Sequence, residues 1–385
     1  RSPRSYTTED VVEIQCHGSP FVMRKILDLL LRHGARLADS GEFTQRAFLH
    51  GRIDLTQAEA VLDLVHASSE LGSALAVQQL QGKLYNAIED VKRQVVNISS
   101  LVEASIEFPE ENVEFVNFDH CIRQIKKASS DLEKMLVHAN YGLRFREGFS
   151  VALIGRPNVG KSSLLNRLLR DQRAIVTPVP GTTRDYIEES IQIKGIAFRL
   201  TDTAGIRNTK DLIESEGIRQ TRNVQSRSDL ILLIIDCGEK LDEEDLKLIR
   251  DVEKNNTIIV INKIDLLSGR QTIWQREFSG MDYISVSAKT GEGCDELESK
   301  LYDKATLGVS PHKDEIWITN RRQQQAAECA LESLLKARRG LEQSKGEEFV
   351  AADLRSCLKA LGDIVGQTTP DDLLGQIFSE FCIGK

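Results

Sequence analysis

The sequence predicts an α/β domain with a mostly parallel sheet, inserted into an all-α helical domain and preceded by a partial α+β unit. Three observations support this multidomain fold class. Short apolar strands alternate with helical segments between about residues 148 and 305. Apolar residues recur at spacings of three and four on either side of that stretch. The chain has 385 residues, enough for two or three domains of ~150 residues each.

The expected helices lie before and after the middle of the chain. No proline interrupts residues 21–108, and within them residues 67–107 are expected to form one long helix. Further helices are expected over 122–139, 320–341, 348–361 and 370–381. We therefore expect four segments: a partial unit over 1–48, a helical domain split into 49–147 and 306–385, and an α/β domain over 148–305.

The α/β domain contains six expected strands. They are the apolar segments 150–155, 189–194, 196–203, 229–236, 257–262 and 283–287. Because helical segments separate most of them, the sheet is expected to be mostly parallel and covered by helices.

Composition restricts the kind of protein. Lys and Arg number 50 against 58 Asp and Glu, a net charge of −8, which argues against a broad basic face for nucleic acid. The seven cysteines include no C-x-x-C pair, so we expect reduced thiols in an intracellular compartment. The apolar run 230–235 is far shorter than the ~20 residues of a membrane span. Because Arg1 is not preceded by an initiator methionine, we expect a fragment or a processed chain.

The segment GRPNVGKS (155–162) matches the pattern G-x-x-x-x-G-K-[ST] between an expected strand and an expected helix. Its glycines let the backbone wrap a phosphate, and the amides of the helix start point at that phosphate. Lys161 adds a cation, and Ser162 is expected to ligate Mg²⁺. The pattern predicts a phosphate site formed by Asn158, Val159, Gly160, Lys161, Ser162 and Ser163.

Further motifs at strand ends predict a guanine nucleotide. In DTAG (202–205), Asp202 is placed to support the magnesium shell and the Gly205 amide to reach the terminal phosphate. In the motif NKID (262–265), Asp265 can accept both N–H donors of the Watson–Crick edge of guanine, a pair of donors that adenine lacks. The motif SAK (287–289) is expected to close over the base. The base site would comprise Asn262, Lys263, Asp265, Ser287, Ala288 and Lys289.

The segment GTTRD (181–185) lies between the phosphate loop and Asp202 and has few apolar neighbours. It would contribute Gly181 and Thr182 to nucleotide binding, and Thr183 is placed to complete the magnesium sphere. We therefore expect a switch segment here.

The spacing of these motifs does not identify the residue that orients the attacking water. Ras-like enzymes use a Gln just after Asp-x-x-Gly, but Ile206 stands there. Glu214, at the start of an expected helix, could order water. Alternatively, Asn158 and backbone carbonyls of residues 177–183 could hold a monovalent cation in place of an arginine finger. The sequence pattern leaves both possibilities open.

These motifs resemble the tRNA modification GTPase family of the MnmE (TrmE) type, within the TrmE–Era–EngA-like superfamily. The segments GEFTQRAFLHGRIDLTQAEAV (41–61) and FCIGK (381–385) add to the resemblance, which covers the whole chain. It implies a P-loop GTPase domain inserted into a helical domain. It also implies that residues 1–48 are part of a folate-binding and dimerisation domain, truncated before Arg1.

The resemblance also implies how the GTPase works. Family members are activated by potassium and by dimerisation of their GTP domains. The family's general-base-like glutamate corresponds to Glu214, with Lys161 and Asn158 as further catalytic residues. The potassium ligands would be Asn158, Thr177, Val179 and Thr182.

The implied reaction modifies carbon 5 of the wobble uridine of tRNA. The implied partners are a second copy of the chain, tRNA and an FAD-containing protein of the MnmG (GidA) type in a heterotetrameric complex. A tetrahydrofolate would supply the one-carbon unit near Cys382, and Lys385 would bind a cofactor. The expected location is the cytoplasm of a bacterium, or a chloroplast or mitochondrion.

Two alternative functions remain at this point. One is a ribosome-assembly GTP switch, whose relatives share GRPNVGKSS and DTAG. The other is a GTP-binding module without competent chemistry.

Overall fold

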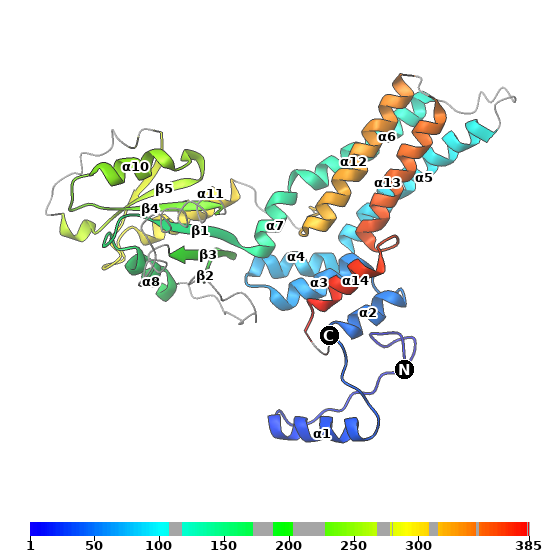
Figure 1. Cartoon of the computed structure of the whole chain (residues 1–385), viewed down its shortest axis with the longest axis horizontal. Helices are drawn as coiled ribbons and strands as arrows, with labels where there is room; N and C mark the ends of the chain where they lie inside the picture. The colour runs from blue at the N-terminus through cyan, green and yellow to red at the C-terminus, as the bar shows by residue number, and fades with distance from the viewer. Residues whose placement is uncertain are drawn as a thin grey trace. The chain divides into compact units, whose positions relative to one another are not determined.

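The computed structural model describes residues 1–107, 118–171, 188–202, 228–267, 278, 280–307, 315–343, 346–382 and 384. The chain forms two compact units, each built from separate segments. The helical unit comprises Arg1–Val65, Leu75–Asn140 and Ile316–Lys385, and the α/β unit comprises His66–Ala74 and Tyr141–Glu315. Most of the α/β unit is therefore inserted in sequence between two parts of the helical unit (Figure 1).

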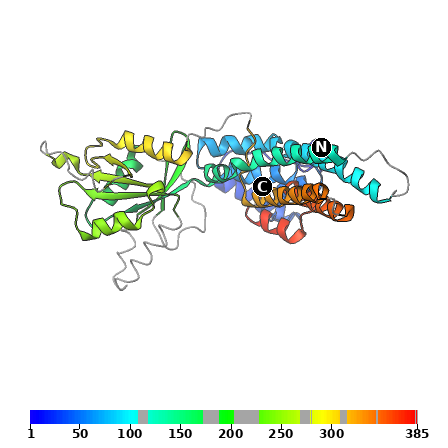
Figure 2. The ribbon, with the colours of Figure 1, turned by 90° about the horizontal axis from the view of Figure 1, so that it is seen from above.

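The helical unit contains several long helices (Figures 1 and 2). Three of the described helices, α3, α4 and α7, have residues in both units. None of the helices in the described ranges is long and apolar enough to cross a membrane. The helices of the two ends of the chain are α1 (Pro20–Arg32), α2 (Glu42–Leu49), α3 (Leu55–His66), α4 (Glu70–Leu80), α5 (Lys83–Glu107), α6 (Phe118–Val137), α7 (Ala139–Glu147), α12 (Arg321–Glu342), α13 (Glu347–Val365) and α14 (Asp371–Ser379).

One sequence-based expectation for these helices is wrong. Residues 67–107 do not form a single helix but the two helices α4 and α5, which meet at a turn over Gln81 and Gly82. Gly82 has φ +78°, a left-handed conformation that glycine adopts readily and that ends a helix. The apolar spacing continues through the turn, so periodicity alone did not show it.

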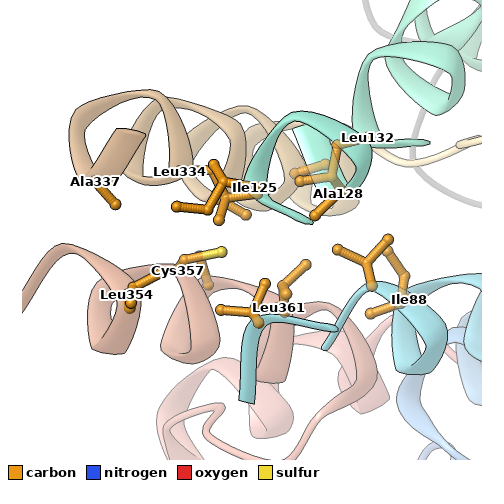
Figure 3. Packing of buried hydrophobic residues seen from close by; sticks show 14 of the residues in the cluster. Ile88, Ile125, Ala128, Leu132, Leu334, Ala337, Leu354, Cys357 and Leu361 are labelled. Carbon is orange, nitrogen blue, oxygen red and sulfur yellow. The ribbon is translucent and has the colours of Figure 1, made fainter. Parts of the chain in front are cut away.

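The core of the helical unit lies between α5, α6, α12 and α13 (Figure 3). Helix α5 buries Leu84, Ile88, Val91, Val95, Ile98 and Val102, a spacing of three and four that places one apolar stripe on the core side. Ile88, Ile125, Leu334 and Leu361, one from each of the four helices, are all fully buried in this cluster. Burial also raises the pKa of the Cys357 thiol to about 12, so this thiol stays protonated and unreactive.

A buried carboxylate joins α3 to the helices of the C-terminal part. Glu59 is only 3% exposed. The Arg322 guanidinium donates from Nε and Nη2 to its two oxygens at 2.8 Å each, and Gln323 Nε2 donates to Oε2 at 2.8 Å. Arg322 Nη2 also donates to the Ile364 carbonyl at 3.0 Å. A bidentate pair of this kind fixes the relative placement of α3, the start of α12 and the end of α13.

A second carboxylate network orders the start of α2. Arg36 donates from Nη1 to Glu42 Oε2 at 2.8 Å, and Arg46 donates from Nη2 to Glu42 Oε1 at 2.6 Å. The Asp39 backbone amide also donates to Glu42, at 2.9 Å. The hydrogen bond from Arg36, followed by that from Asp39, lowers the pKa of Glu42 to about 2. The GEFTQR part of the 41–61 motif is thus held together by this charged cluster.

The α/β unit has a six-stranded sheet of order β2-β3-β1-β4-β5-β6. Only β2 runs antiparallel to its neighbour, β3, and the other pairs are parallel. The residues of β4 and β5 are buried throughout, as expected where helices cover both faces of a parallel sheet. The strands are β1 (Phe149–Ile154), β2 (Glu188–Ile193), β3 (Ile196–Asp202), β4 (Leu230–Asp236), β5 (Thr257–Asn262) and β6 (Asp282–Ser285), with α8 (Lys161–Asp171), α10 (Glu243–Asp251) and α11 (Cys294–Thr306).

The predicted fold class is confirmed: a mostly parallel sheet is inserted in sequence into a helical structure. The parallel strands have their carboxyl ends at one edge. Ile154, Asp236 and Asn262 end β1, β4 and β5 there. This edge is where ligands bind in open α/β sheets.

We predict that Glu59→Ala destabilises the helical unit by about 3–5 kcal/mol, because the substitution leaves the largely buried Arg322 guanidinium and the fully buried Gln323 amide without their shared carboxylate. Urea unfolding, followed by circular dichroism, measures the change. The matched control is Glu332→Ala, which removes an exposed i,i+4 ion pair with Lys336 on α12 and should leave the midpoint almost unchanged. Equal midpoints for the two variants would contradict the role of Glu59.

Candidate functional site

The phosphate loop connects β1 to α8 through backbone conformations that few residues adopt. Gly155 has φ +152°, Asn158 +65° and Gly160 +99°. A Cβ on Gly155 would lie 2.4 Å from the Ile234 carbonyl oxygen, and one on Gly160 would lie 2.3 Å from Asn262 Nδ2. Both glycines are therefore required by the close approach of neighbouring strands as well as by their φ angles.

The two polar residues that begin α8 are held in place within this loop. Lys161 Nζ donates to the carbonyls of Gly155 at 2.8 Å and Arg156 at 2.6 Å, so the ammonium lies over the loop. Ser162 Oγ donates to Asp202 Oδ2 at 2.7 Å. A hydroxyl beside a carboxylate at a helix N-terminus is the oxygen donor set that P-loop proteins use for Mg²⁺. The described residues thus fit a magnesium–nucleotide complex.

Asn262, at the end of β5, connects three of the predicted motifs. It is 1% exposed. Its Nδ2 donates to the Val159 carbonyl at 2.9 Å, and its Oδ1 accepts from the Lys263 amide at 2.8 Å and the Ala288 amide at 3.0 Å. One amide side chain therefore joins the phosphate loop, the NKID motif and the SAK motif.

Lys263 supports the outer side of the phosphate loop. Its backbone is left-handed, with φ +68°. Its Nζ donates to the Asn158 carbonyl at 2.8 Å and to Asp236 Oδ2 at 2.6 Å. Asp236 was missed by the sequence reasoning, although a carboxylate at the end of the apolar strand β4 was a signal for it.

The predicted base-recognition residues lie together. Ser287 Oγ donates to Asp265 Oδ1 at 2.7 Å, and the Thr290 amide donates to Ser287 Oγ at 3.1 Å. Asp265 and Lys289 are exposed, whereas Ser287 is fully buried. A buried hydroxyl thus orients an exposed carboxylate beside the phosphate loop.

Arg156 attaches the phosphate loop to the segment before α10. It forms ion pairs with Asp242, with Glu239 at 2.6 Å and with Asp245 at 3.0 Å, and its side chain is 16% exposed. Asp242 also caps α10 by accepting from the Asp245 amide at 2.9 Å, and this backbone hydrogen bond is the main cause of the lowered pKa of Asp242. Sequence reasoning missed this cluster, because a run of acids before a helix normally signals only a cap.

Several predicted site residues lie outside the described residues. They are Thr177, Val179, Gly181, Thr182, Thr183, Arg184, Asp185, Gly205, Glu214 and Lys385. Cys382 is described and exposed, and its carbonyl accepts from the Gly41 amide at 3.4 Å. Among the residues that the structure does describe, no three His, Cys, Asp or Glu side chains form a metal-binding group.

These features define the class of the α/β unit. A glycine-rich loop follows a buried strand and begins a helix, a strand-end carboxylate contacts the first serine of that helix, and an NKID motif packs behind the loop. This is a P-loop GTPase domain.

Comparison with known proteins identifies the family: the chain belongs to the MnmE family of tRNA modification GTPases. The model of the MnmE helical domain matches residues 55–382, and that of the N-terminus of the GTP-binding protein TrmE matches residues 1–52.

Individual relatives agree with the family models. The tRNA modification GTPase MnmE of Alkaliphilus oremlandii is 43% identical, over 100% of this chain and 84% of that protein. The MnmE of Enterococcus faecalis is 41% identical, over 100% of this chain and 83% of that protein. Among solved structures, the G domain of the T. maritima FeoB iron transporter is 29% identical, with a TM-score of 0.32, and the match covers 41% of this chain and 98% of that one.

We predict that Asn262→Ala loosens the phosphate loop, because the substitution leaves the Val159 carbonyl and the Lys263 and Ala288 amides without their shared partner. Hydrogen–deuterium exchange of peptides covering residues 155–162 should become faster in the nucleotide-free protein. The matched control is Gln192→Ala on the edge strand β2, which truncates an amide far along the sheet and should leave those peptides unchanged. Unchanged exchange in Asn262→Ala would show that the amide does not order the loop.

Proposed function

We propose that this protein hydrolyses GTP and thereby drives modification of carbon 5 of the wobble uridine of tRNA. The observation that carries the proposal is the set of Asn262 hydrogen bonds, which join the phosphate loop to the NKID and SAK motifs; the NKID motif carries Asp265, the carboxylate expected to recognise guanine. Membership of the MnmE family supports the tRNA half of the proposal, because the relatives are named tRNA modification GTPases.

The proposed nucleotide site uses the described geometry. Lys161 and the backbone amides of residues 158–163 would bind the phosphates, with Gly205 at the terminal one. Ser162 and Thr183 would hold Mg²⁺, and Asp202 would orient its shell through the Ser162 hydroxyl. When bound, the metal would neutralise charge on the phosphate oxygens.

The proposed base site distinguishes guanine from adenine. Asp265 would accept the two N–H donors of the guanine edge, and Ser287 would hold the carboxylate in that orientation. Asn262, Lys263, Ala288 and Lys289 would complete the wall around the base. Adenine offers no such pair of donors, so it would leave the carboxylate unpaired.

We also propose the wider assembly that the family resemblance implies. The chain would divide into segments 1–48, 49–147, 148–305 and 306–385, the first belonging to a folate-binding and dimerisation domain. It would act as a homodimer with an FAD-containing MnmG (GidA)-type partner, taking a one-carbon unit from a tetrahydrofolate near Cys382 and Lys385. The cytoplasm of a bacterium is the favoured location, with a chloroplast or mitochondrion as the alternative.

Potassium is the proposed activator of hydrolysis. Its ligands would be Asn158, Thr177, Val179 and Thr182. Asn158 supports this assignment because its side chain is exposed while its backbone is fixed by Lys263 at 2.8 Å. A cation beside the transferred phosphoryl would serve in place of an arginine finger.

We predict that GTP turnover is at least ten-fold faster in potassium than in sodium at equal ionic strength, and that Asn158→Ala removes this difference. Steady-state phosphate release measures it. Asn140→Ala, which changes an asparagine in the helical unit, is the control and should respond to potassium like the unaltered chain. Equal rates in the two salts would disprove the cation assignment.

Glu214 is the proposed water-orienting residue. We predict that Glu214→Ala preserves nucleotide affinity within about two-fold but lowers turnover at least a hundred-fold, the usual cost of losing a group that acts in the transition state. Binding of a fluorescent GTP analogue and single-turnover hydrolysis separate the two quantities. Retained turnover would remove Glu214 from the mechanism.

A further inference from the structure

An ion pair at the carboxyl ends of the neighbouring strands β4 and β5 is connected to the phosphate loop (Figure 1). Asp236 ends β4 beside Asn262, which ends β5. The Asp236 side chain is 9% exposed. Its Oδ1 accepts from the Gly238 amide at 2.9 Å, and its Oδ2 accepts from Lys263 Nζ at 2.6 Å. Both oxygens of this buried carboxylate therefore have a partner.

Pairing of the two strands does not require this carboxylate. The backbone already joins the strand ends, because the Cys237 amide donates to the Asn262 carbonyl at 3.0 Å. The charge of Asp236 acts instead on Lys263, whose side chain is 33% exposed. A lysine ammonium is a mobile point charge on a four-carbon stem. The carboxylate thus holds a partly exposed ammonium in one position.

The ammonium held by Asp236 contacts an uncommon turn of the phosphate loop. Lys263 Nζ donates to the Asn158 carbonyl at 2.8 Å. Asn158 has φ +65° and Lys263 has φ +68°, and a positive φ is uncommon outside glycine. Within the described ranges five non-glycine residues have a positive φ, and this hydrogen bond joins two of them. The contact therefore offsets the cost of both backbone conformations.

Two successive carbonyls of the loop are held from the end of β5. Lys263 holds the Asn158 carbonyl, and Asn262 Nδ2 holds the Val159 carbonyl at 2.9 Å. Both peptides are trans, and in a trans peptide the carbonyl and the next amide point in opposite directions. The amides of Val159 and Gly160 therefore point away from the two anchors. Amides directed in this way can converge on a phosphate bound in the loop.

We propose that Asp236 is a positioning residue for the nucleotide. By holding the Lys263 ammonium on the Asn158 carbonyl, it directs the Val159 amide at a bound phosphate and slows the release of guanine nucleotide. The inference rests on the proposed function, which places a guanine nucleotide in this loop. A carboxamide at position 236 cannot replace the carboxylate, because its single acceptor oxygen cannot serve both the Gly238 amide and the Lys263 ammonium.

The test measures release of a fluorescent GDP analogue from the full chain, by stopped-flow displacement with excess GDP. Asp236→Asn should release the analogue about ten-fold faster or more, because a largely buried hydrogen bond between charged groups is lost. Lys263→Met, which keeps the apolar stem and removes the ammonium, should have the same effect. The matched control is Asp282→Asn, which breaks an ion pair with Lys304 at the start of β6 and should change release by less than about two-fold.

A double variant separates positioning from a purely structural role. If Asp236 acts through Lys263, Asp236→Asn should change release by less than about two-fold in a chain that already carries Lys263→Met. Effects of the two substitutions that multiply in the double variant would overturn the inference.

The Val159 amide provides a second, spectroscopic readout. NMR of protein labelled at valine shows this amide, and its signal is assigned by its loss in Val159→Ile. A hydrogen bond to a charged phosphate should move the amide proton downfield when GDP binds. The movement in Asp236→Asn should be less than about half of that in the unaltered chain, because the amide is no longer directed at the phosphate. An equal movement in the two proteins would overturn the inference.

The remaining outcomes distinguish the inference from the proposed function. If the unaltered chain binds and hydrolyses GTP but Asp236→Asn releases nucleotide at the normal rate, the inference fails and the proposed function stands. If the unaltered chain binds no guanine nucleotide, both fail. If Asp236→Asn accelerates release but the unaltered chain does not hydrolyse GTP, the inference stands and the hydrolysis half of the proposed function fails. Should Asp236→Asn not fold, Lys263→Met decides, and normal release with a normal Val159 signal in that variant would overturn the inference.

Discussion

The buried amide of Asn262 is the interaction on which the candidate nucleotide site depends. Its hydrogen bonds join the Val159 carbonyl to the Lys263 and Ala288 amides, which come more than a hundred residues later in the sequence. A buried amide left without partners costs about 1–3 kcal/mol, so the Asn262 contacts favour this mutual arrangement of the phosphate loop and the base-recognition motifs. The same contact requires a glycine at position 160, because any side chain there would occupy the position of the Asn262 amide.

In the helical unit a buried charged group, the Glu59 carboxylate, joins separate segments as the Asn262 amide does in the α/β unit. Glu59 brings together three helices through Arg322, Gln323 and the helix-end carbonyl of Ile364. A buried ion pair contributes specificity more than stability, because desolvation offsets much of the attraction. Apolar contacts such as those of α12 and α13 are non-directional, whereas the Glu59 hydrogen bonds require one placement of α3 against the start of α12 and the end of α13.

The sequence predicted the fold correctly wherever a local pattern of residues determines the local structure. The six expected strands lie within two residues of β1–β6 at either end, because each is a short apolar run bounded by polar residues. Gly82 ended a helix without breaking the periodicity, so only its backbone angle revealed the turn. Arg156 and Asp236 were missed because their partners come from other segments. Asn262, Ser287 and Asp265 were found because their spacing is itself a motif.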